Sequence, residues 1–570
     1  MANITIFERD ISNISTSNIN NNIVYVPGYA VMGPINKPTL CRTLREFQEI
    51  FGTQPYIFET NQTYSSIVSF VDVPTELQSN GVYALQGSKE LSYYYVTELL
   101  NQGLYVLFER VAKDNIPYAK KELNYTPSGE SKFIIKAKFP GKFYEDMNVN
   151  LSFDSTSQRY TLIASYKIVI NGLERTISNT SNPLVFSFNP VDEHYIGAYD
   201  SNNKFIEIES EFVQLSFSGT LPTLYGDECA VISAYDGKLN GEVVENEFSI
   251  QDIYSKFAKD STTNLCIFDN LIDRGEYDLK FISSGVYPTF DSNKSELAIN
   301  LLKASGQRGD CIGLVDYFKD FYAKVEDFEE SGTLSYQVNN VFANSIDIKR
   351  NSNGTEKIED ARTYGTMFTP WANYKSSIEN NKTFKMPGSF AYLLSLAQSV
   401  KTNPNWYAVA GVARAVVPNL LSLDYNITGA IADSLQTNEG VSINPITNIK
   451  PYGYTIWGNR TLLFNKGEIV ATSLLNIRSL ACDVKKVVYT AAKKFMFEPI
   501  SDILWLNFKS EIEPTLDKMV SGNGLTNYRI IRQATTEKAT ISACIRLYAV
   551  EPVENFDITL EISDSYISVE

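Results

Sequence analysis

The side chains that could carry out catalysis are few, and their spacing fits none of the common catalytic sites. The chain contains one histidine, His194, whereas H-E-x-x-H zinc sites and other paired-histidine metal sites need two. His194 lies in the polar stretch NPVDEHYIGAY with no G-x-S-x-G motif near it, which argues against a Ser-His-Asp triad. We therefore place His194 in a surface loop or turn, and we predict no catalytic residue and no metal site.

Glycine and carboxylate patterns give no sign of a nucleotide site or of hydrolysis. Neither G-x-x-x-x-G-K-[ST] nor a G-x-G-x-x-G after a strand occurs, and the nearest candidate, at 522–524, is typical of a turn. Aspartate and glutamate are frequent, but a glycosidase pair is defined by its separation in space and not by abundance. The Arg308-Gly309-Asp310 triplet lies between helix-like and strand-like segments, so we interpret it as a turn. These patterns give no support for a nucleotide or other cofactor site, and they neither identify nor exclude a carboxylate pair.

The overall composition is that of a folded, acidic protein. The chain has 570 residues, of which 44% are hydrophobic and 20% charged, and its formal net charge is −16. That charge argues against nucleic acid as a main partner, because phosphate backbones bind surfaces with an excess of cations. No apolar stretch is long enough to insert into a membrane, and the N-terminus lacks the features of a secretory signal. The six widely spaced cysteines are interpreted as buried, reduced thiols, which suits folding in a reducing cytoplasm.

The order of patterns along the chain predicts a multidomain α+β or α/β protein. Strand-like IVYVPG followed by helix-like TLREFQEIF starts an α/β rhythm, which resumes after a region of alternating apolar and polar residues such as KFIIKA and VQLSFS. We therefore expect a discontinuous α/β core built from N- and C-terminal segments, with a β-rich insert and extended terminal arms. The expected regions are an N-terminal arm (1–22), an N-terminal core segment (23–120), the insert (121–225), a C-terminal core segment (226–545, with a polar excursion at about 317–360) and a C-terminal arm strand (546–570).

The N-terminal arm carries isolated isoleucines in a polar context. Residues 1–22 are rich in asparagine and serine, and such a segment cannot build a core of its own. Ile11, Ile14, Ile19 and Ile23 would therefore need a partner surface.

The C-terminus shows a strict period of two that is typical of a half-buried strand. Phe556, Ile558, Leu560 and Ile562 alternate with polar residues, and no basic residue follows Arg546. From the residues alone, an edge strand of its own domain and a strand donated to another subunit are equally good interpretations.

The clearest helical pattern spans about 469–496. Apolar residues recur there at three- and four-residue intervals, and Arg478, Lys485, Lys486 and Lys493 fall on the opposite side of the helical wheel. A plain solvated face is the simpler interpretation of these cations, and a binding face is the alternative.

Several stretches, in this order, resemble the contractile tail sheath proteins of bacteriophages and related contractile injection systems. They are YVPGYAVMGPINKPTLCRTLREFQEIFG, IKAKFPGKFYEDMNVNLSF, AYDGKLNG, RGDCIGLVD, FTPWANY, GVSINPITNIKPYGYTIWGNRTL, LLNIRSLACDVKKVVYTAAKKFMFEPI and IRLYAVEPVENFDITLEIS. The usual Gly-Asn pair after the Pro-Gly of the second stretch is replaced here by Tyr144-Glu145-Asp146, and 317–360 shows no match.

The resemblance implies a non-enzymatic structural subunit of a virion tail. Such subunits assemble in the bacterial cytoplasm as stacked helical rings around an inner tail tube and contract to drive it through the host envelope for genome ejection. The partners implied are other copies of the chain, the tube protein, the baseplate and the tail terminator. Terminal segments of the family add strands to neighbouring subunits, which favours donation by both arms. The basic face with Lys485, Lys486, Lys493 and Lys494 would then meet an acidic tube.

Two alternatives stay open at this point. The sheath of a non-viral contractile device, such as a bacteriocin particle or a secretion apparatus, would have much the same sequence. An acidic polysaccharide hydrolase is the alternative of a different class, for which the 35 tyrosines and 4 tryptophans could stack on sugars.

Overall fold

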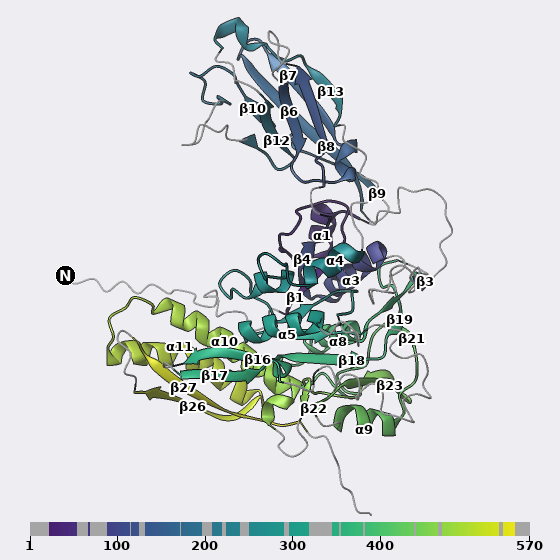
Figure 1. The fold of residues 1–570 in the computed structure, drawn as a ribbon, viewed down its shortest axis with the longest axis vertical. Coiled ribbons are helices and arrows are strands. Elements are labelled where there is room, and N and C mark those ends of the chain that lie inside the picture. Colours follow the sequence, from purple (N-terminus) through teal and green to yellow (C-terminus); the bar gives the residue numbers. More distant parts are fainter. Residues whose placement is uncertain are drawn as a thin grey trace, which may run out of the picture.

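The computed structural model describes most of the chain. The described residues are 22–53, 67–68, 88–113, 116–124, 132–170, 173–196, 208–218, 224–239, 250–289, 296–317, 342, 345–352, 355–379, 382–437, 440–464, 470–534 and 540–552. Figure 1 shows a large α/β body, a β-rich unit that stands apart from it, and a smaller group of elements near the C-terminus.

The body is organised around an eight-stranded, mostly parallel sheet. The strand order is β2-β4-β1-β14-β15-β18-β23-β24, and only the end pairs β2/β4 and β23/β24 are antiparallel. The strands are β1 (Ile23–Gly28), β2 (Thr39–Cys41), β4 (Tyr105–Arg110), β14 (Phe281–Ser283), β15 (Ile312–Val315), β18 (Gly365–Thr369), β23 (Asn444–Ile449) and β24 (Gly453–Ile456). Strands from both sides of the β-rich unit thus share one sheet, which confirms the predicted discontinuous α/β core.

Helices cover both faces of this sheet, which is why its strands are continuous apolar runs. Gly313 and Gly365 are register neighbours, and a Cβ on either would collide with a leucine of α5 (Glu296–Arg308), so α5 lies directly on that face. Phe281 and Phe368 point to the opposite face, where their rings pack on Tyr392 of α8. The remaining helices of the body are α1 (Leu44–Phe51), α3 (Ser88–Gln102), α4 (Ile250–Phe257), α8 (Gly388–Ser399) and α9 (Gly429–Thr437). None of the described helices is long and apolar enough to cross a membrane.

The Arg308-Gly309-Asp310 triplet forms the turn between α5 and β15, as predicted. Gly309 has a φ of 74°, a conformation that glycine adopts without strain. Arg308 is buried and donates hydrogen bonds to Asp310 and to main-chain carbonyls, among them that of Leu271 at 2.7 Å. The triplet therefore has a structural role inside the body.

The insert is a sandwich of two antiparallel sheets with its own core. One sheet has the order β10-β8-β7-β13 with β9 paired to β8, and the other has the order β11-β12-β6-β5. The strands are β5 (Lys120–Asn124), β6 (Lys132–Ala137), β7 (Asn148–Asp154), β8 (Arg159–Ile170), β9 (Leu173–Ser178), β10 (Leu184–Phe186), β11 (Ile208–Glu209), β12 (Val213–Ser218) and β13 (Tyr235–Lys238). Because β13 pairs with β7, the insert continues beyond the predicted boundary at 225. The four residues of β13 were too short a pattern to reveal this.

A buried arginine joins the insert to the body. Arg110, at the end of β4, donates hydrogen bonds from Nη1 to the carbonyl of Gly33 at 2.8 Å and to that of Pro140 at 3.2 Å. Tyr144 of the insert binds the same loop, since its Oη accepts a hydrogen bond from the amide of Gly33 at 2.9 Å. These contacts hold the sandwich against the loop that follows β1.

Smaller sheets complete the structure. A four-stranded sheet has the order β21-β19-β20-β3, and β16/β17, β22/β25 and β26/β27 form pairs. The strands are β3 (Ile67–Val68), β16 (Asp347–Ser352), β17 (Thr355–Asp360), β19 (Ala372–Lys375), β20 (Thr383–Met386), β21 (Leu420–Leu423), β22 (Gly440–Val441), β25 (Leu463–Phe464), β26 (Leu525–Gln533) and β27 (Ser542–Ala549). The predicted polar excursion at 317–360 contains the β16/β17 hairpin, while 318–341 lies outside the described residues.

Candidate functional site

A two-stranded hairpin near the C-terminus has both of its long edges open within the described regions of the chain. β26 and β27 are antiparallel, and neither pairs with any other described strand. The side chains of Tyr528, Ile530 and Ile545 point to one face and pack against helices. The free N–H and C=O groups of such an edge can pair with one more strand. The hairpin is therefore a possible acceptor for an added strand.

Two long helices support this hairpin. They are α10 (Leu475–Lys494) and α11 (Asp502–Ser521). Ser501 caps α11 by accepting a hydrogen bond from the amide of Leu504 at 3.1 Å, which satisfies a donor that the first helical turn leaves free. A small buried core joins both helices to the hairpin. Its members are Trp406, Leu480, Val484, Ala491, Ile512, Leu516, Met519 and Leu525.

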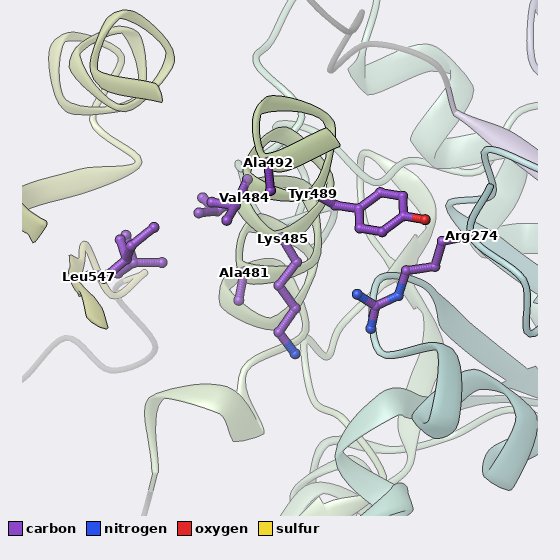
Figure 2. A pocket seen from close by; sticks show the side chains of 9 residues that line it. Arg274, Ala481, Val484, Lys485, Tyr489, Ala492 and Leu547 are labelled. Atoms are coloured by element: carbon purple, nitrogen blue, oxygen red, sulfur yellow. The ribbon is translucent and has the colours of Figure 1, made fainter. Parts of the chain in front are cut away.

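An apolar groove of about 440 Å³ lies between α10 and β27 (Figure 2). The residues that line it are Ala481, Val484, Val488 and Ala492 of α10, Ile545 and Leu547 of β27, and Arg274, Lys485 and Tyr489. Figure 2 shows Tyr489 and Arg274 directed toward one another, and the Arg274 guanidinium lies 5.9 Å from the ring centroid of Tyr489. No lining residue is acidic. The groove thus offers apolar contacts beside an open strand edge, with cations nearby.

α10 is fixed to the body by a buried ion pair. Lys280, next to β14, donates from Nζ to Asp483 Oδ1 at 2.5 Å, and the two side chains are 2% and 3% exposed. Lys280 Nζ also lies 3.4 Å from the carbonyl of Ser479, one turn earlier on α10. Because neither charge has access to water, each depends on the other for its solvation.

Tyr364 of the body makes a second set of contacts with α10. The Arg478 guanidinium and the Lys485 ammonium lie over the ring of Tyr364, at 4.3 and 4.9 Å from its centroid. Lys485 Nζ also donates a hydrogen bond to Tyr364 Oη at 2.7 Å. Cations over an aromatic face are attracted by its negative π surface. α10 therefore belongs both to the body and to the wall of the groove.

The thiols around α10 are inert. Of the six cysteines, five are buried and Cys544 is partly buried, and all are free. Burial raises the pKa of Cys311 to about 12 and also raises that of Cys482. The Cys311 and Cys482 thiols therefore stay protonated at neutral pH, and burial is confirmed for five of the six cysteines.

Comparison with known proteins gives one direct sequence match. A tail sheath protein of Vibrio phage KVP40 is 23% identical to this chain over 194 residues. The matched part of the chain is thus similar to a phage tail sheath protein. The match spans 33% of this chain and 28% of the phage sheath protein, so it covers less than a third of that relative's length. No family model matches the chain.

Comparison with solved structures gives matches to sheath proteins, among them three with TM-scores below 0.5. The sheath tail protein of Listeria innocua gives a TM-score of 0.47 at 9% identity, covering 93% of this chain and 95% of that chain. The sheath tail protein of Desulfitobacterium hafniense gives 0.40 at 10% identity, covering 96% and 100%. The contracted PVC sheath complex of an extracellular contractile injection system gives 0.37 at 19% identity, covering 51% and 72%.

Of the residues predicted to donate strands in such a sheath, the structure describes only Ile23. Ile23 opens β1, faces Tyr105 in the register with β4 and is 5% exposed. It belongs to the chain's own central sheet, which corrects the prediction for this residue. The error arose because Ile23 stands where the polar arm meets the first buried strand. The other candidates lie outside the described residues: Ile11, Ile14, Ile19, Phe556, Ile558, Leu560 and Ile562.

The lysines predicted to face a sheath's inner tube lie in two different environments. Lys485 and Lys486 are partly buried, and Lys486 pairs with Asp278 of the body at 2.7 Å. Lys493 and Lys494 are exposed near the C-terminal end of α10. Lys494 forms an ion pair with Glu511 of α11.

The predicted basic face of α10 is therefore not a continuous outward surface. Arg478, assigned to that face, is 8% exposed, because its guanidinium packs on Tyr364. A helical wheel places residues around an axis, but it does not show that a second aromatic surface covers the polar side. The prediction is wrong for Arg478.

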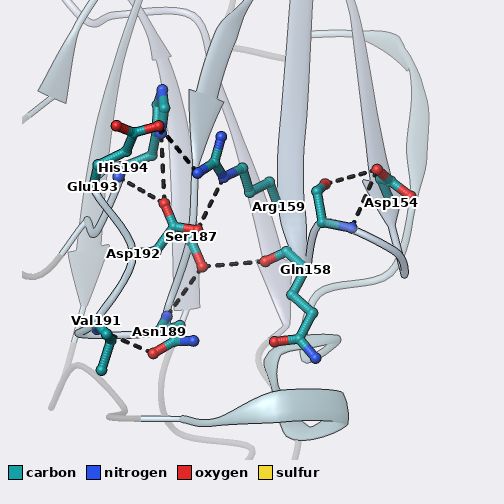
Figure 3. A network of polar contacts seen from close by, with 10 residues as sticks. Asp154, Gln158, Arg159, Ser187, Asn189, Val191, Asp192, Glu193 and His194 are labelled. Atoms are coloured by element: carbon teal, nitrogen blue, oxygen red, sulfur yellow. Dashed lines mark hydrogen bonds and ion pairs between the residues drawn. The ribbon is translucent and has the colours of Figure 1, made fainter.

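His194 lies in a loop of the insert (Figure 3). Its amide donates to Asp192 Oδ1 at 2.8 Å, and Arg159 of β8 donates from Nε to Asp192 Oδ2 at 2.9 Å. The Nδ1 atom of His194 lies 3.5 Å from both Asp192 Oδ1 and Glu193 Oε1. Together these contacts fasten the loop onto β8. Among the described residues, no group of three or more His, Cys, Asp and Glu side chains could hold a metal ion.

Sequence reasoning missed the residues that form the groove. Ile545 and Leu547 alternate with Arg546 and Tyr548, and this period of two could have identified β27 as a strand with one apolar face. Nothing local to this stretch indicates that it lies beside α10. That proximity comes from packing between segments about sixty residues apart in the chain.

Proposed function

We propose that the chain is a structural subunit of a contractile tail sheath, which polymerises helically around an inner tail tube and contracts to drive the tube through the host cell envelope. The observation that carries this proposal is the open β26/β27 hairpin beside an apolar groove. A strand added to the edge of β27 would gain main-chain hydrogen bonds and would cover that groove with its apolar side chains. The similarity to a phage tail sheath protein supports the same function.

A donor arm and an acceptor groove on one chain suffice for polymerisation. The proposed donors are the arm at 1–22 and the residues that follow β27. β27 ends at Ala549, so the first four residues of the arm predicted at 546–570 belong to the acceptor hairpin. The donated segment and the accepting edge are still different parts of the chain. Such a contact is heterologous, and it propagates as a helix whenever its rotation does not close a ring. Main-chain pairing also tolerates relative rotation of the subunits, because the donated strand can stay bound while its linker bends. The arms then keep neighbouring copies connected through contraction.

Contraction in this scheme is a switch between two packings of the same subunits. The extended array is metastable, and the energy comes from subunit contacts that form in the contracted array. The baseplate and the tail terminator hold the extended array at its ends. No catalytic step and no nucleotide is required. The sheath would assemble in the bacterial cytoplasm and act as part of the virion tail.

We place the contact with the inner tube at the exposed end of α10. Lys493 and Lys494 are exposed there, and Lys494 would exchange its ion pair with Glu511 for an acidic group of the tube. Screened surface pairs of this kind are weak enough to be released during contraction. Lys485 and Lys486 would act indirectly, since both already contact the body. Unchanged tube binding by the Lys493→Glu/Lys494→Glu variant would contradict this placement.

Negative-stain electron microscopy over a concentration series tests the proposal. The full chain should form long hollow tubes, and a chain without 1–22 and 551–570 should not. Val484→Asp, which puts a charge on the floor of the groove, should also prevent assembly, whereas Val191→Asp on the exposed surface of the insert should not. Equal tubes from the trimmed chain would contradict strand exchange. A full chain that stays monomeric at every concentration, with inner tube protein present, would contradict the sheath assignment.

A further inference from the structure

The outward face of the β26/β27 hairpin carries two arginines directly opposite one another. In the register of the hairpin, Arg529 of β26 faces Arg546 of β27. Side chains in such a position are only about 5 Å apart at Cβ, and like charges there are destabilising. Both residues are exposed, and neither forms an ion pair within the described residues. Among the described residues, these two facing cations have no anionic partner, and their repulsion lowers the stability of the hairpin.

The two facing arginines are the only unpaired cations of the hairpin among the described residues. The two strands contain three arginines and no acidic residue. The third, Arg532, is neutralised by Asp502 of α11 at 2.7 Å. The residues next to the arginine pair, Ile530 and Ile545, point to the other face and pack in the small core with the helices. An anionic partner for Arg529 and Arg546 must therefore approach from outside the described structure.

The C-terminal segment of the chain has the complementary charge. After Arg546 it carries six acidic residues and no basic one. In an extended strand from 556 to 562, Phe556 and Ile558 point to one side, and Asp557 and Glu561 point to the other. If the apolar side covers the groove, both carboxylates lie on the same outward face as the arginines.

We propose that Arg529 and Arg546 are the recognition site for the acidic face of residues 556–562 of a second copy, bound along the free edge of β27. This inference rests on the proposed function and adds to it the residues that select the incoming strand. Asp557 and Glu561 are about 13 Å apart along a strand, with Thr559 midway between them. If Thr559 lies directly opposite Arg546, both carboxylates are diagonal neighbours of Arg546. A shift of two residues would instead bring one of the carboxylates directly opposite Arg546, so the charge pairing selects an acidic outward face and not a single register.

Two energetic costs disfavour a shift of the incoming strand by one residue. It would turn Asp557 and Glu561 into the apolar groove, where carboxylates lack partners, and it would turn the apolar side chains outward. The groove determines which face of the strand points inward, and the arginines require that the outward face be acidic. Together they would distinguish this acidic segment from the N-terminal arm, whose residues 10–22 contain a single charge, Asp10.

Mixed-disulfide formation between two full-length chains tests this inference. One chain carries Leu547→Cys in the groove, and the other carries Phe556→Cys, Ile558→Cys or Leu560→Cys in the tail. Parent chains with only the native cysteines report the background. We expect covalent dimers on mild oxidation. Arg529→Glu/Arg546→Glu in the groove chain should lower the yield by roughly fivefold or more, because two attractive pairs become repulsive.

Compensating and matched variants separate charge recognition from other effects. Asp557→Lys/Glu561→Lys is added to the chain that carries the tail cysteine. This chain should again form covalent dimers in good yield with the groove chain that carries Arg529→Glu/Arg546→Glu. The matched reversal Arg42→Glu/Arg45→Glu, on exposed residues at the N-terminal end of α1, should leave it unchanged.

Each alternative result has a definite meaning. Loss of dimers with Val484→Asp but not with the arginine reversals would leave strand donation intact and overturn this inference. Failure of the lysine tail to rescue would overturn it as well. No mixed dimers from any parent pair would overturn both this inference and the proposed donation, including the case in which the tail binds within its own chain.

Discussion

We expect the stability of the chain to depend on pH because of a buried carboxyl group in the body. Asp316 follows β15 and is 1% exposed. It accepts hydrogen bonds from the amide and the hydroxyl of Ser389 in the first turn of α8, with the amide at 3.0 Å. Asp316 interacts electrostatically with the hydroxyls of Tyr95 in α3 and Tyr374 in β19, and no described cation pairs with it. Burial raises the pKa of Asp316 to about 7, although the Ser389 hydrogen bonds oppose this.

The sign and the size of the effect follow from this shift. The folded state holds a proton that the unfolded chain loses near its ordinary pKa of 3.8. The protonated Asp316 carboxyl therefore contributes its full share to the free energy of unfolding at low pH. This contribution decreases as the pH rises toward 7 and is absent at higher pH. A shift of about 3 units corresponds to a contribution of about 4 kcal/mol. Glu109, whose pKa burial also raises to about 7, adds a loss in the same direction.

The variant Asp316→Asn isolates the contribution of Asp316 to the pH dependence of the free energy of unfolding. The amide keeps the shape and can still accept from Ser389, but it carries no charge at any pH. Relative to the original chain, the variant should gain about 4 kcal/mol of stability between pH 4 and pH 8, measured by urea unfolding with tryptophan fluorescence. Asp236→Asn, at an exposed carboxylate of the insert, is the matched control and should show no such trend. A constant difference between Asp316→Asn and the original chain across this pH range would show that Asp316 is not the group responsible.

Two further predictions concern the attachment of α10. Lys280→Met should destabilise the chain by about 3–5 kcal/mol in urea unfolding, because it leaves the Asp483 carboxylate buried and unpaired. Lys280→Met/Asp483→Leu should recover most of that loss, and a double variant as unstable as the single one would show that the pair is not coupled. Tyr364→Leu removes the ring under Arg478 and Lys485 and should speed hydrogen exchange along α10. Tyr364→Phe keeps the ring, so its exchange rate should lie between those of the original chain and Tyr364→Leu. Equal exchange in all three chains would contradict the cation–π attachment.

Local patterns were enough to predict much of the fold. The apolar run IVYVPG is β1, and the helical spacing of Phe47 and Phe51 is α1. The alternation in KFIIKA and VQLSFS gives β6 and β12, which pair with one another in the insert. These elements could be found because each repeats its own period over six or more residues and is flanked by turn residues.

What could not be predicted depends on contacts between distant segments. The side chain of Arg478 is buried because Tyr364, over one hundred residues earlier, covers it. The ion pair between Lys280 and Asp483 likewise joins two segments that no local pattern relates. The groove forms only where β27 and α10 come together. A helical wheel or a strand pattern reports the faces of one element, while these features belong to pairs of elements.

Helical reconstruction by cryo-electron microscopy of the assembled full chain would show directly whether the subunits exchange strands as proposed. We expect a hollow tube of stacked subunits in which residues 556–562 of one copy run along the free edge of β27 of its neighbour and cover the groove beside α10. A closed or non-tubular assembly, or a tube in which the edge of β27 is unpaired and the groove is empty, would contradict the proposed sheath subunit and its strand exchange.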